Sequence, residues 1–440
     1  MTAPGSGGPT PPTEPTRSLP PVHESWLPRE HPLHRPRHGQ QRGALVAALA
    51  FFLVPTIAFV FGVRPQQIEN RPLAGFPSIA SGWGFFTGLS GWATDNLPLR
   101  DSAVHAESGV SQGIFGEEPS FSSEGQSSAD GVLGPLGSPP AASQPSQSGS
   151  FPNVIQGSNG WLYYGEDIEA KCLAIQPVST TIADLEQLRS AVEASGRKLV
   201  LAVAPDKTTA LPQNMPANYP GKQCAQQVGQ QFWSQVTSQA GALDLRTELR
   251  TMYQMDNVPS YYKQDTHWTD AGALAMLHAV AEDIQPGVSE TWRSSPGALV
   301  THAVDLPPLV GQSGTGTDRA YLLSPDGSTD RTGAYGDISN QPVTEHGTPT
   351  SGMISAPVSV LGDSFLGPAT RYLPAIFSNV TYLGYGWLGT DPGPADQAMI
   401  DSHVIVLEVV ERNLTSGTAP FLQPSVIGDI RSLLAAHPVH

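Results

Sequence analysis

An uncharged apolar segment near the N-terminus limits what this chain can fold into. It runs from Gly43 to Val63 and reads GALVAALAFFLVPTIAFVFGV. A helix of this length spans roughly 30 Å, the thickness of the hydrocarbon core of a bilayer, and a proline such as Pro55 is tolerated in membrane helices. So long a run without charge is rare in a soluble core helix. Residues 43–63 therefore predict a transmembrane helix.

The surroundings of this segment predict its orientation and its fate. Its apolar stretch is longer than the roughly 7–15 residues of a cleaved signal peptide, so we expect an uncleaved signal anchor. Basic residues are in excess on the N-terminal side, which predicts a cytoplasmic N-terminus and an extracytoplasmic remainder. The flanking basic residues are Arg29, Arg35, Arg37 and Arg42 before the segment, and Arg64 and Arg71 after it. The predicted location is the cell membrane, in a single pass.

Composition divides the rest of the chain. Residues 1–42 are rich in Pro, Gly and Arg and predict a disordered cytoplasmic tail. Residues 64–116 carry aromatic side chains at turn-like spacing and predict a juxtamembrane helical segment that packs on the main domain. Residues 117–150 are a Ser/Pro/Gly linker, and residues 151–437 form the predicted catalytic domain.

Charge and cysteine content exclude some classes of protein. The formal net charge of −16 repels phosphate backbones, so nucleic-acid binding is not expected. The chain has two cysteines, Cys172 and Cys224, and no CxxC motif that would indicate a structural zinc site. Outside the cytoplasm two thiols usually pair, and we expect a Cys172–Cys224 disulfide; two independent buried thiols are the alternative.

Strand and helix patterns alternate through the main domain. Residues 154–165 predict a strand, a turn and a second strand, and residues 181–196 predict an amphipathic helix. Three continuous apolar runs predict buried parallel strands within 198–205, 356–365 and 402–414. Helical patterns cover 270–284 and 371–377. This alternation predicts an α/β domain in which helices cover both faces of a parallel sheet, with ligands beyond the carboxyl ends of the strands.

The first motif at such a strand end is Gly362-Asp363-Ser364-Phe365. Glycine allows a sharp bend, and we expect Ser364 to open a helix whose backbone N–H groups favour negative charge. An exposed hydroxyl beside such donors is what a nucleophile requires. Serine is also a common helix cap, and this motif alone favours the cap. For Asp363 the predicted role is capping.

The second motif is Asp265-Thr266-His267-Trp268-Thr269, directly before the predicted helix 270–284. A carboxylate two residues from a histidine can accept the Nδ1–H bond and leave Nε2 to take a proton from serine. A surface aspartate beside a histidine stacked on tryptophan would give the same motif. So would a metal site made of Asp265, His267 and a third ligand such as Asp270.

Together the two motifs resemble the alginate O-acetyltransferase family of the AlgX and AlgJ type, which is SGNH-hydrolase-like. The Asp-x-His pair precedes the serine by about 100 residues, as in the permuted acetyltransferase branch of that group. Other matching stretches lie at 69–77 (ENRPLAGFP), 95–101 (DNLPLRD), 157–165 (GSNGWLYYG), 202–216 (AVAPDKTTALPQNMP) and 404–414 (VIVLEVVERNL). The segments 117–150 and 310–350 depart from the bacterial alginate proteins.

The resemblance implies a fold, an activity and partners. It implies a three-layer αβα domain and an O-acetyltransferase in which Ser364 is the nucleophile, His267 the general base and Asp265 its orienter. It implies transfer of acetyl to hydroxyls of a cell-surface or secreted polysaccharide, with a multi-pass membrane O-acyltransferase as donor and with no cofactor or metal. A carbohydrate acetyl-esterase and a non-catalytic polysaccharide-binding or assembly protein are the alternatives. The candidate substrate-binding residues are Tyr262, Trp268 and Arg371. Lys207 and Arg412 also fit family-like positions.

Overall fold

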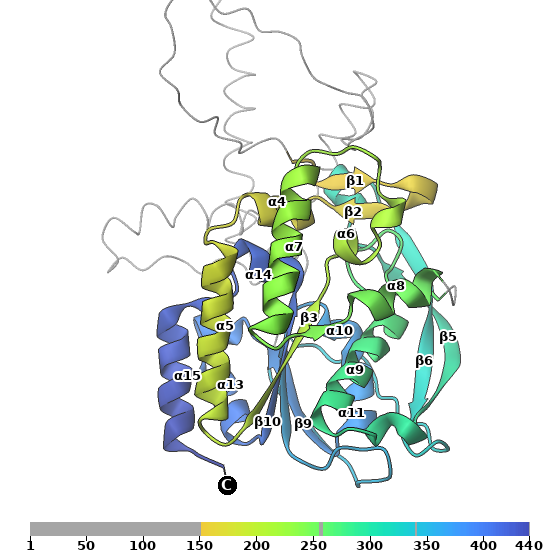
Figure 1. Cartoon of the computed structure of the whole chain (residues 1–440). Helices are drawn as coiled ribbons and strands as arrows, with labels where there is room; N and C mark the ends of the chain where they lie inside the picture. Colours follow the sequence, from red (N-terminus) through yellow and green to blue (C-terminus); the bar gives the residue numbers. More distant parts are fainter. Residues whose placement is uncertain (1–150, 255–257, 339–340, 440) are drawn as a thin grey trace, which may run out of the picture. The chain divides into compact units, whose positions relative to one another are not determined.

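A twisted six-stranded sheet lies at the centre of the protein (Figure 1). The computed structural model describes residues 151–254, 258–338 and 341–439. The strand order is β4-β3-β10-β8-β9-β7, and all neighbours are parallel except β7, which runs antiparallel to β9. The strands are β3 (Lys198–Ala204), β4 (Leu243–Asp244), β7 (Val343–His346), β8 (Val358–Gly362), β9 (Asn379–Gly384) and β10 (Val404–Val410).

The central strands are buried on both faces, which explains why they are continuous apolar runs in the sequence. Every residue of β8 and β10 is buried. Alternate residues of β3 enter two different hydrophobic clusters, because successive side chains of a strand point to opposite faces. Leu199, Leu201 and Val203 pack into one cluster, and Val200, Ala202 and Ala204 into the other.

Helices cover both faces of the sheet. One cluster is completed by residues of α5 (Val178–Glu193), α7 (Lys222–Ser238), α13 (Gly393–Ile400) and α15 (Pro424–Ala436). The other is completed by residues of α8 (Arg246–Gln254), α9 (Asp270–Ile284), α10 (Leu366–Ala369) and α11 (Leu373–Ile376). The shorter elements are α4 (Glu166–Cys172), α6 (Lys207–Ala210), η5 (Pro212–Asn214), η6 (Val288–Thr291), η7 (Pro307–Val310), η8 (Thr370–Tyr372), α12 (Trp387–Thr390), α14 (Glu411–Ser416) and η9 (Pro420–Leu422).

Two antiparallel pairs lie outside the central sheet. The hairpin β1 (Val154–Gln156) and β2 (Leu162–Tyr164) is joined through the turn η4 (Ser158–Gly160), where Asn159 has a φ of 55°. A long ribbon pairs β5 (Arg293–Ala303) with β6 (Thr315–Ser324). Figure 1 shows this ribbon beside α9.

Most predicted elements are confirmed. The predicted strands of 154–165, 198–205, 356–365 and 402–414 correspond to β1 with β2, β3, β8 and β10, and helix 270–284 has the predicted bounds. The expected parallel sheet is confirmed for β4, β3, β10, β8 and β9, whereas the edge strand β7 is antiparallel to β9. This edge strand alternates half-buried and exposed residues, so it carries no buried apolar run that would reveal it.

The expected disulfide is present. Cys172 of α4 is bonded to Cys224 of α7, with their Cα atoms 5.8 Å apart. The predicted segments 1–42, 43–63, 64–116 and 117–150 lie outside the described residues. Among the helices that are described, none has both the length and the apolar character needed to cross a membrane.

Candidate active site

The carboxyl ends of three neighbouring strands bring the candidate residues to one edge of the sheet. Strand β3 leads into Asp206 and Lys207, β8 into Asp363 and Ser364, and β10 into Glu411. Because β10 lies between β3 and β8 in parallel register, these three exits are adjacent. This is the edge at which open α/β sheets bind ligands.

The Asp265–His267 motif sits in a tight loop before α9. Tyr261 and Trp268 pair across the loop in an antiparallel bridge, and the Tyr262 N–H donates to the His267 carbonyl at 3.0 Å. Thr269 then caps α9, its hydroxyl accepting from the Gly272 N–H at 3.3 Å. The loop is therefore closed at its base by backbone hydrogen bonds.

Within the loop the carboxylate orients the imidazole. His267 Nδ1 lies 2.7 Å from Asp265 Oδ1, and the His267 backbone N–H donates to the same oxygen at 3.0 Å. This geometry places a proton on Nδ1 between the ring and Asp265. His267 Nε2 is buried and has no hydrogen-bond partner among the described residues. The expected pairing of Asp265 with His267 is confirmed, and Nε2 is left to act on another group.

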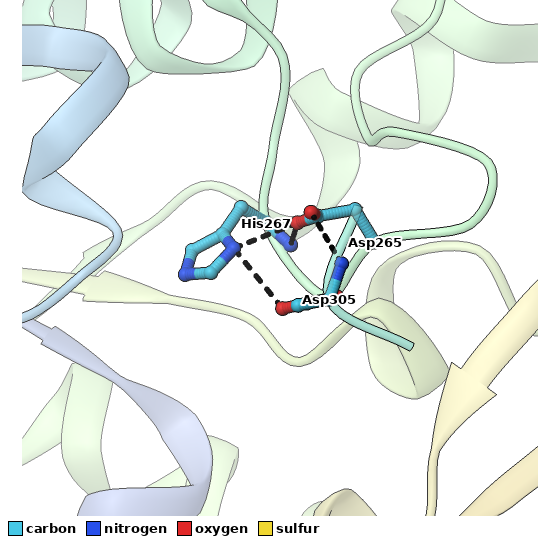
Figure 2. A group of neighbouring side chains, drawn as sticks. All are labelled: Asp265, His267 and Asp305. Carbon is cyan, nitrogen blue, oxygen red and sulfur yellow. Dashed lines mark hydrogen bonds and ion pairs between the residues drawn. The ribbon is translucent and has the colours of Figure 1, made fainter. Parts of the chain in front are cut away.

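A second carboxylate, which the sequence analysis missed, reaches the same imidazole (Figure 2). Asp305 Oδ2 lies 3.4 Å from His267 Nδ1. Asp305 Oδ1 accepts the Thr266 N–H at 2.8 Å, Oδ2 accepts the Thr266 hydroxyl, and the Asp305 N–H donates to Asp265 Oδ2 at 3.1 Å. No spacing pattern links Asp305 to the motif, because it belongs to the segment after β5.

The two carboxylates control the charge of the histidine. Burial alone would lower the pKa of His267, but the neighbouring Asp265 and Asp305 carboxylates raise it to about 9, against a smaller opposing effect of Arg412. Burial raises the pKa of Asp265, but His267 and its hydrogen bonds more than offset this and the net shift is downward. The pKa of Asp305 is raised by burial and by Asp265. The two carboxylates thus favour the protonated form of the imidazole.

Ser364 lies at the end of β8, in a turn held by Asp363. The Asp363 carboxylate accepts from the N–H groups of Phe365 at 3.1 Å and Val410 at 2.9 Å. It also accepts from the Tyr385 hydroxyl and the Asn413 amide. A side chain at Gly362 would collide with Leu366 and Glu408, which explains the glycine. Asp363 therefore ties β8 to β10 and fixes the turn. Its predicted role as a helix cap is wrong, because the N-cap residue of α10 is Phe365 and no side chain caps this helix.

The expectation that Ser364 opens a substantial helix is wrong. Helix α10 begins two residues later at Leu366 and contains one turn only. The N–H groups of Phe365, Leu366 and Gly367 are taken up by Asp363 and by the Ser364 carbonyl. A long helix after Ser364 would offer free backbone N–H groups to a bound anion. Here the helix ends after one turn, where η8 begins, and these three N–H groups are already hydrogen-bonded within the protein.

Packing brings the residue after Ser364 against the histidine. The Phe365 ring lies 4.9 Å from the His267 ring, centroid to centroid. The Trp268 indole N–H donates to the Phe365 carbonyl at 2.7 Å. The two motifs, far apart in sequence, thus contact each other directly.

The three candidate substrate-binding residues have different surroundings. Trp268 is 0% exposed, so its indole supports the Ser364 turn from within the core and has no surface to offer a substrate. Tyr262 is half-buried, and its ring lies 4.4 Å from the His302 ring, centroid to centroid, at a tilt of 52°. Arg371 donates to Asp270 at 3.2 Å and lies over the half-exposed ring of Tyr335.

Asp270 does not lie with the other donors of the metal-site alternative. Its carboxylate accepts from the hydroxyls of Tyr335 and Tyr372. Among the described residues, Asp265, His267 and Asp305 do bring donor atoms within 4.8 Å of one another. All four carboxylate oxygens of that group already accept hydrogen bonds from the protein, as given above. The two carboxylates are therefore hydrogen-bonded within the protein, whereas His267 Nε2 has no partner among the described residues.

A buried cluster of charged residues lies next to the site, at the residues that follow β3 and β10. Lys171 pairs with Asp206 and with Glu411, and the Arg412 N–H donates to Asp206 at 3.1 Å. Lys207 is fully buried, and its ammonium donates to the Tyr262 and Asp265 carbonyls at 3.1 and 2.5 Å. Burial lowers the pKa of Lys207 to about 8 in spite of nearby carboxylates. Lys207 and the cluster residues thus hold the motif loop and the strand ends in place.

Comparison with known proteins finds sequence similarity in one part of the chain. Residues 154–343 match the model of the family described as "SGNH hydrolase-like domain, acetyltransferase AlgX". This match includes Asp265, His267 and Asp305 and ends before Ser364. The probable alginate O-acetylase AlgJ of Pseudomonas syringae pv. tomato is 32% identical over 162 residues, which is 36% of this chain and 40% of that protein. The AlgJ of Azotobacter vinelandii is 28% identical over 135 residues, 31% of this chain and 34% of that protein.

Solved structures are similar as well. The O-acetyltransferase domain of Pseudomonas putida AlgJ has 19% identity and a TM-score of 0.41, covering 64% of this chain and 99% of that one. Bacillus cereus PatB1 with a sulfonyl adduct has 14% identity and a TM-score of 0.44, covering 59% of this chain and 95% of that one. The chain spans about 40% of the length of the first curated relative that it matches. Residues 154–343 are thus similar to the SGNH hydrolase-like domain of acetyltransferases of the AlgX and AlgJ type.

Proposed function

We propose that this chain is a membrane-anchored, extracytoplasmic O-acetyltransferase that acetylates a polysaccharide through an acyl-enzyme on Ser364. The observation that carries the proposal is the oriented Asp265–His267 pair, whose buried Nε2 has no hydrogen-bond partner among the described residues. The ring contact between His267 and Phe365, the neighbour of Ser364, supports the assignment of the nucleophile.

The proposed reaction has two half-reactions. In the first, His267 Nε2 takes the Ser364 hydroxyl proton while the oxygen attacks the acetyl carbonyl of the donor, and the leaving group departs with that proton. In the second, Nε2 takes the proton of a sugar hydroxyl as the sugar oxygen attacks the acetyl carbon, and Ser364 leaves and regains the proton. Asp265 stabilises the imidazolium in both steps.

The cellular setting is part of the same proposal. Residues 43–63 would anchor the chain with its N-terminus in the cytoplasm, and a multi-pass membrane O-acyltransferase would supply acetyl groups across the bilayer. Relatives are named as probable alginate O-acetylases, which makes a uronate polysaccharide the first acceptor to test. Protease protection in sealed vesicles tests the orientation, since a cytoplasmic main domain would contradict it.

Acetyl transfer can be followed directly by mass spectrometry. The full-length protein is incubated with p-nitrophenyl acetate and deacetylated alginate oligosaccharides. We expect an acetyl group on the Ser364 peptide and then on the sugar, and loss of both in Ser364→Ala and His267→Ala. Ser234→Ala is the matched control, because this exposed serine of α7 bonds only to its own helix.

The other outcomes separate the alternatives. Release of acetate without sugar acetylation would indicate an esterase that uses the same residues. Full activity of Ser364→Ala would contradict the proposal, and binding of the oligosaccharide without turnover would favour an assembly protein. Inactivation by a chelator would point to a metal-dependent reaction in place of the serine mechanism.

A further inference from the structure

We propose that Asp305 is a second positioning carboxylate for His267, brought to the active site by the β5–β6 ribbon. This inference rests on the proposed role of His267 as general base. It assigns Asp305 two tasks: it fixes the loop that presents the imidazole, and it stabilises the imidazolium that forms when Nε2 accepts a proton.

The hydrogen bonds of Asp305 converge on the motif loop. Its carboxylate accepts the N–H and the hydroxyl of Thr266, the residue between Asp265 and His267. Its own N–H donates to Asp265 Oδ2, the oxygen that does not face the imidazole. Asp305 therefore holds the orienting carboxylate and the connecting residue at once, while Asp265 Oδ1 remains directed at Nδ1.

Asp305 is itself held rigidly. Val304 and Leu306, the residues on either side, are 3% and 0% exposed. Leu306 packs with Val154 and Leu162 of the β1–β2 hairpin, and its N–H donates to the Gln264 carbonyl at 3.4 Å. The segment that follows β5 is thus packed between the β1–β2 hairpin and the loop that carries Asp265 and His267. A carboxylate on such a support positions a catalytic group more accurately than one on a loose loop.

The charges that face His267 come from three elements. Asp265 belongs to the motif loop, Asp305 to the end of the ribbon, and Arg412 to α14. Asp265 takes the short contact to Nδ1 at 2.7 Å, and Asp305 Oδ2 lies at 3.4 Å. An opposite charge at this distance favours the protonated ring, whereas the Arg412 guanidinium opposes it. Asp305 therefore makes His267 a stronger base without competing for the Nδ1 proton.

A histidine titration tests this directly. The full-length protein is labelled with ¹⁵N-histidine in detergent micelles, and the His267 ring signals are assigned by comparison with His267→Gln. Asp305→Asn is nearly isosteric and removes one charge. We expect it to lower the pKa of His267 by about one pH unit or more. The acid limb of kcat/KM for acetyl transfer should move down by the same amount.

Asp318→Asn is the matched control. Asp318 lies on the same ribbon and pairs with another histidine, His302, at 3.1 Å. The control variant should leave the pKa of His267 unchanged. An Asp305→Asn protein with an unchanged Tm and an unchanged His267 titration would overturn the inference.

Thr266→Val gives an independent result of opposite sign. It removes the hydroxyl that donates to Asp305 Oδ2 and that lies 3.2 Å from His267 Nδ1, and it leaves both charges. The ring then loses a neutral neighbour, while Asp305 Oδ2, a charged and therefore stronger acceptor, becomes free to accept from Nδ1. The pKa of His267 should then rise, and a fall would contradict the role of Asp305 even if Asp305→Asn failed to fold. The titration needs no turnover. It therefore stands apart from the tests of the proposed function, which all measure acetyl transfer or acetate release.

Discussion

Replacing Trp268 by phenylalanine tests how the two motifs are held together. Trp268 is fully buried, and its indole N–H donates to the Phe365 carbonyl at 2.7 Å, directly after Ser364. Phenylalanine keeps most of the packing but removes this donor. Trp233 offers a matched control, because it is 1% exposed and its indole N–H has no hydrogen-bond partner among the described residues.

The size of the effect follows from this difference. Both substitutions lose part of a buried ring, but only Trp268→Phe leaves a buried carbonyl without its donor, which costs about 1–3 kcal/mol. In a domain of this size 1 kcal/mol lowers Tm by about 2–4 °C. We therefore expect Trp268→Phe to melt roughly 2–12 °C below Trp233→Phe.

Circular dichroism melting of both variants measures the difference, and acetyl transfer measures its consequence. Trp268→Phe should also lower kcat, because the Ser364 turn loses its link to the motif loop. Trp233 belongs to the hydrophobic cluster on the opposite face of the sheet and should leave kcat unchanged. Equal Tm values for the two variants, or an equal loss of kcat, would refute this reasoning.

Three further predictions concern pH and stability. Acetyl transfer should rise with pH and level off above about 9, because His267 must lose its proton before it can accept one from Ser364; a pH–kcat/KM profile that is flat between pH 6 and 9 would contradict this. Replacing Cys172 and Cys224 together by serine should reduce the free energy of unfolding by about 4 kcal/mol in the chain-entropy model; an unchanged denaturant midpoint would exclude a stabilising disulfide. Lys171→Met should cost about 3–5 kcal/mol, because it leaves buried carboxylates without their ammonium partner; urea unfolding checks this, and no loss would mean that the carboxylates are neutral.

Patterns within short stretches of the sequence were sufficient to predict much of the fold. Strand β3 was predicted from an apolar run that is buried on both sheet faces, and α9 from the helical pattern of residues 270–284. The Asp265–His267 pair was predictable because both partners lie within three residues, so backbone geometry alone brings them together. The Cys172–Cys224 bond followed from there being only two cysteines.

Features that depend on distant contacts could not be predicted in this way. The antiparallel edge strand β7 has no apolar run, and Asp305 has no spacing relation to the motif whose histidine it contacts. Trp268 resembled an exposed substrate contact in sequence, but the packing of α9 on the β8 turn buries it completely. Each outcome depends on which surfaces meet after the chain has folded.

The strand and helix periodicities, the apolar segment 43–63 and the DxH and GDSF motifs are properties of short stretches, and the sequence alone defines them. The charge of His267, the second carboxylate and the contact between the two motifs exist only in the folded protein. The physical reason is the distance along the chain over which each interaction acts. Periodicity and hydrogen bonds between near neighbours act over a few residues, whereas burial and Coulomb interactions depend on groups that tertiary packing brings from β5, β8 and β10 to one edge of the sheet.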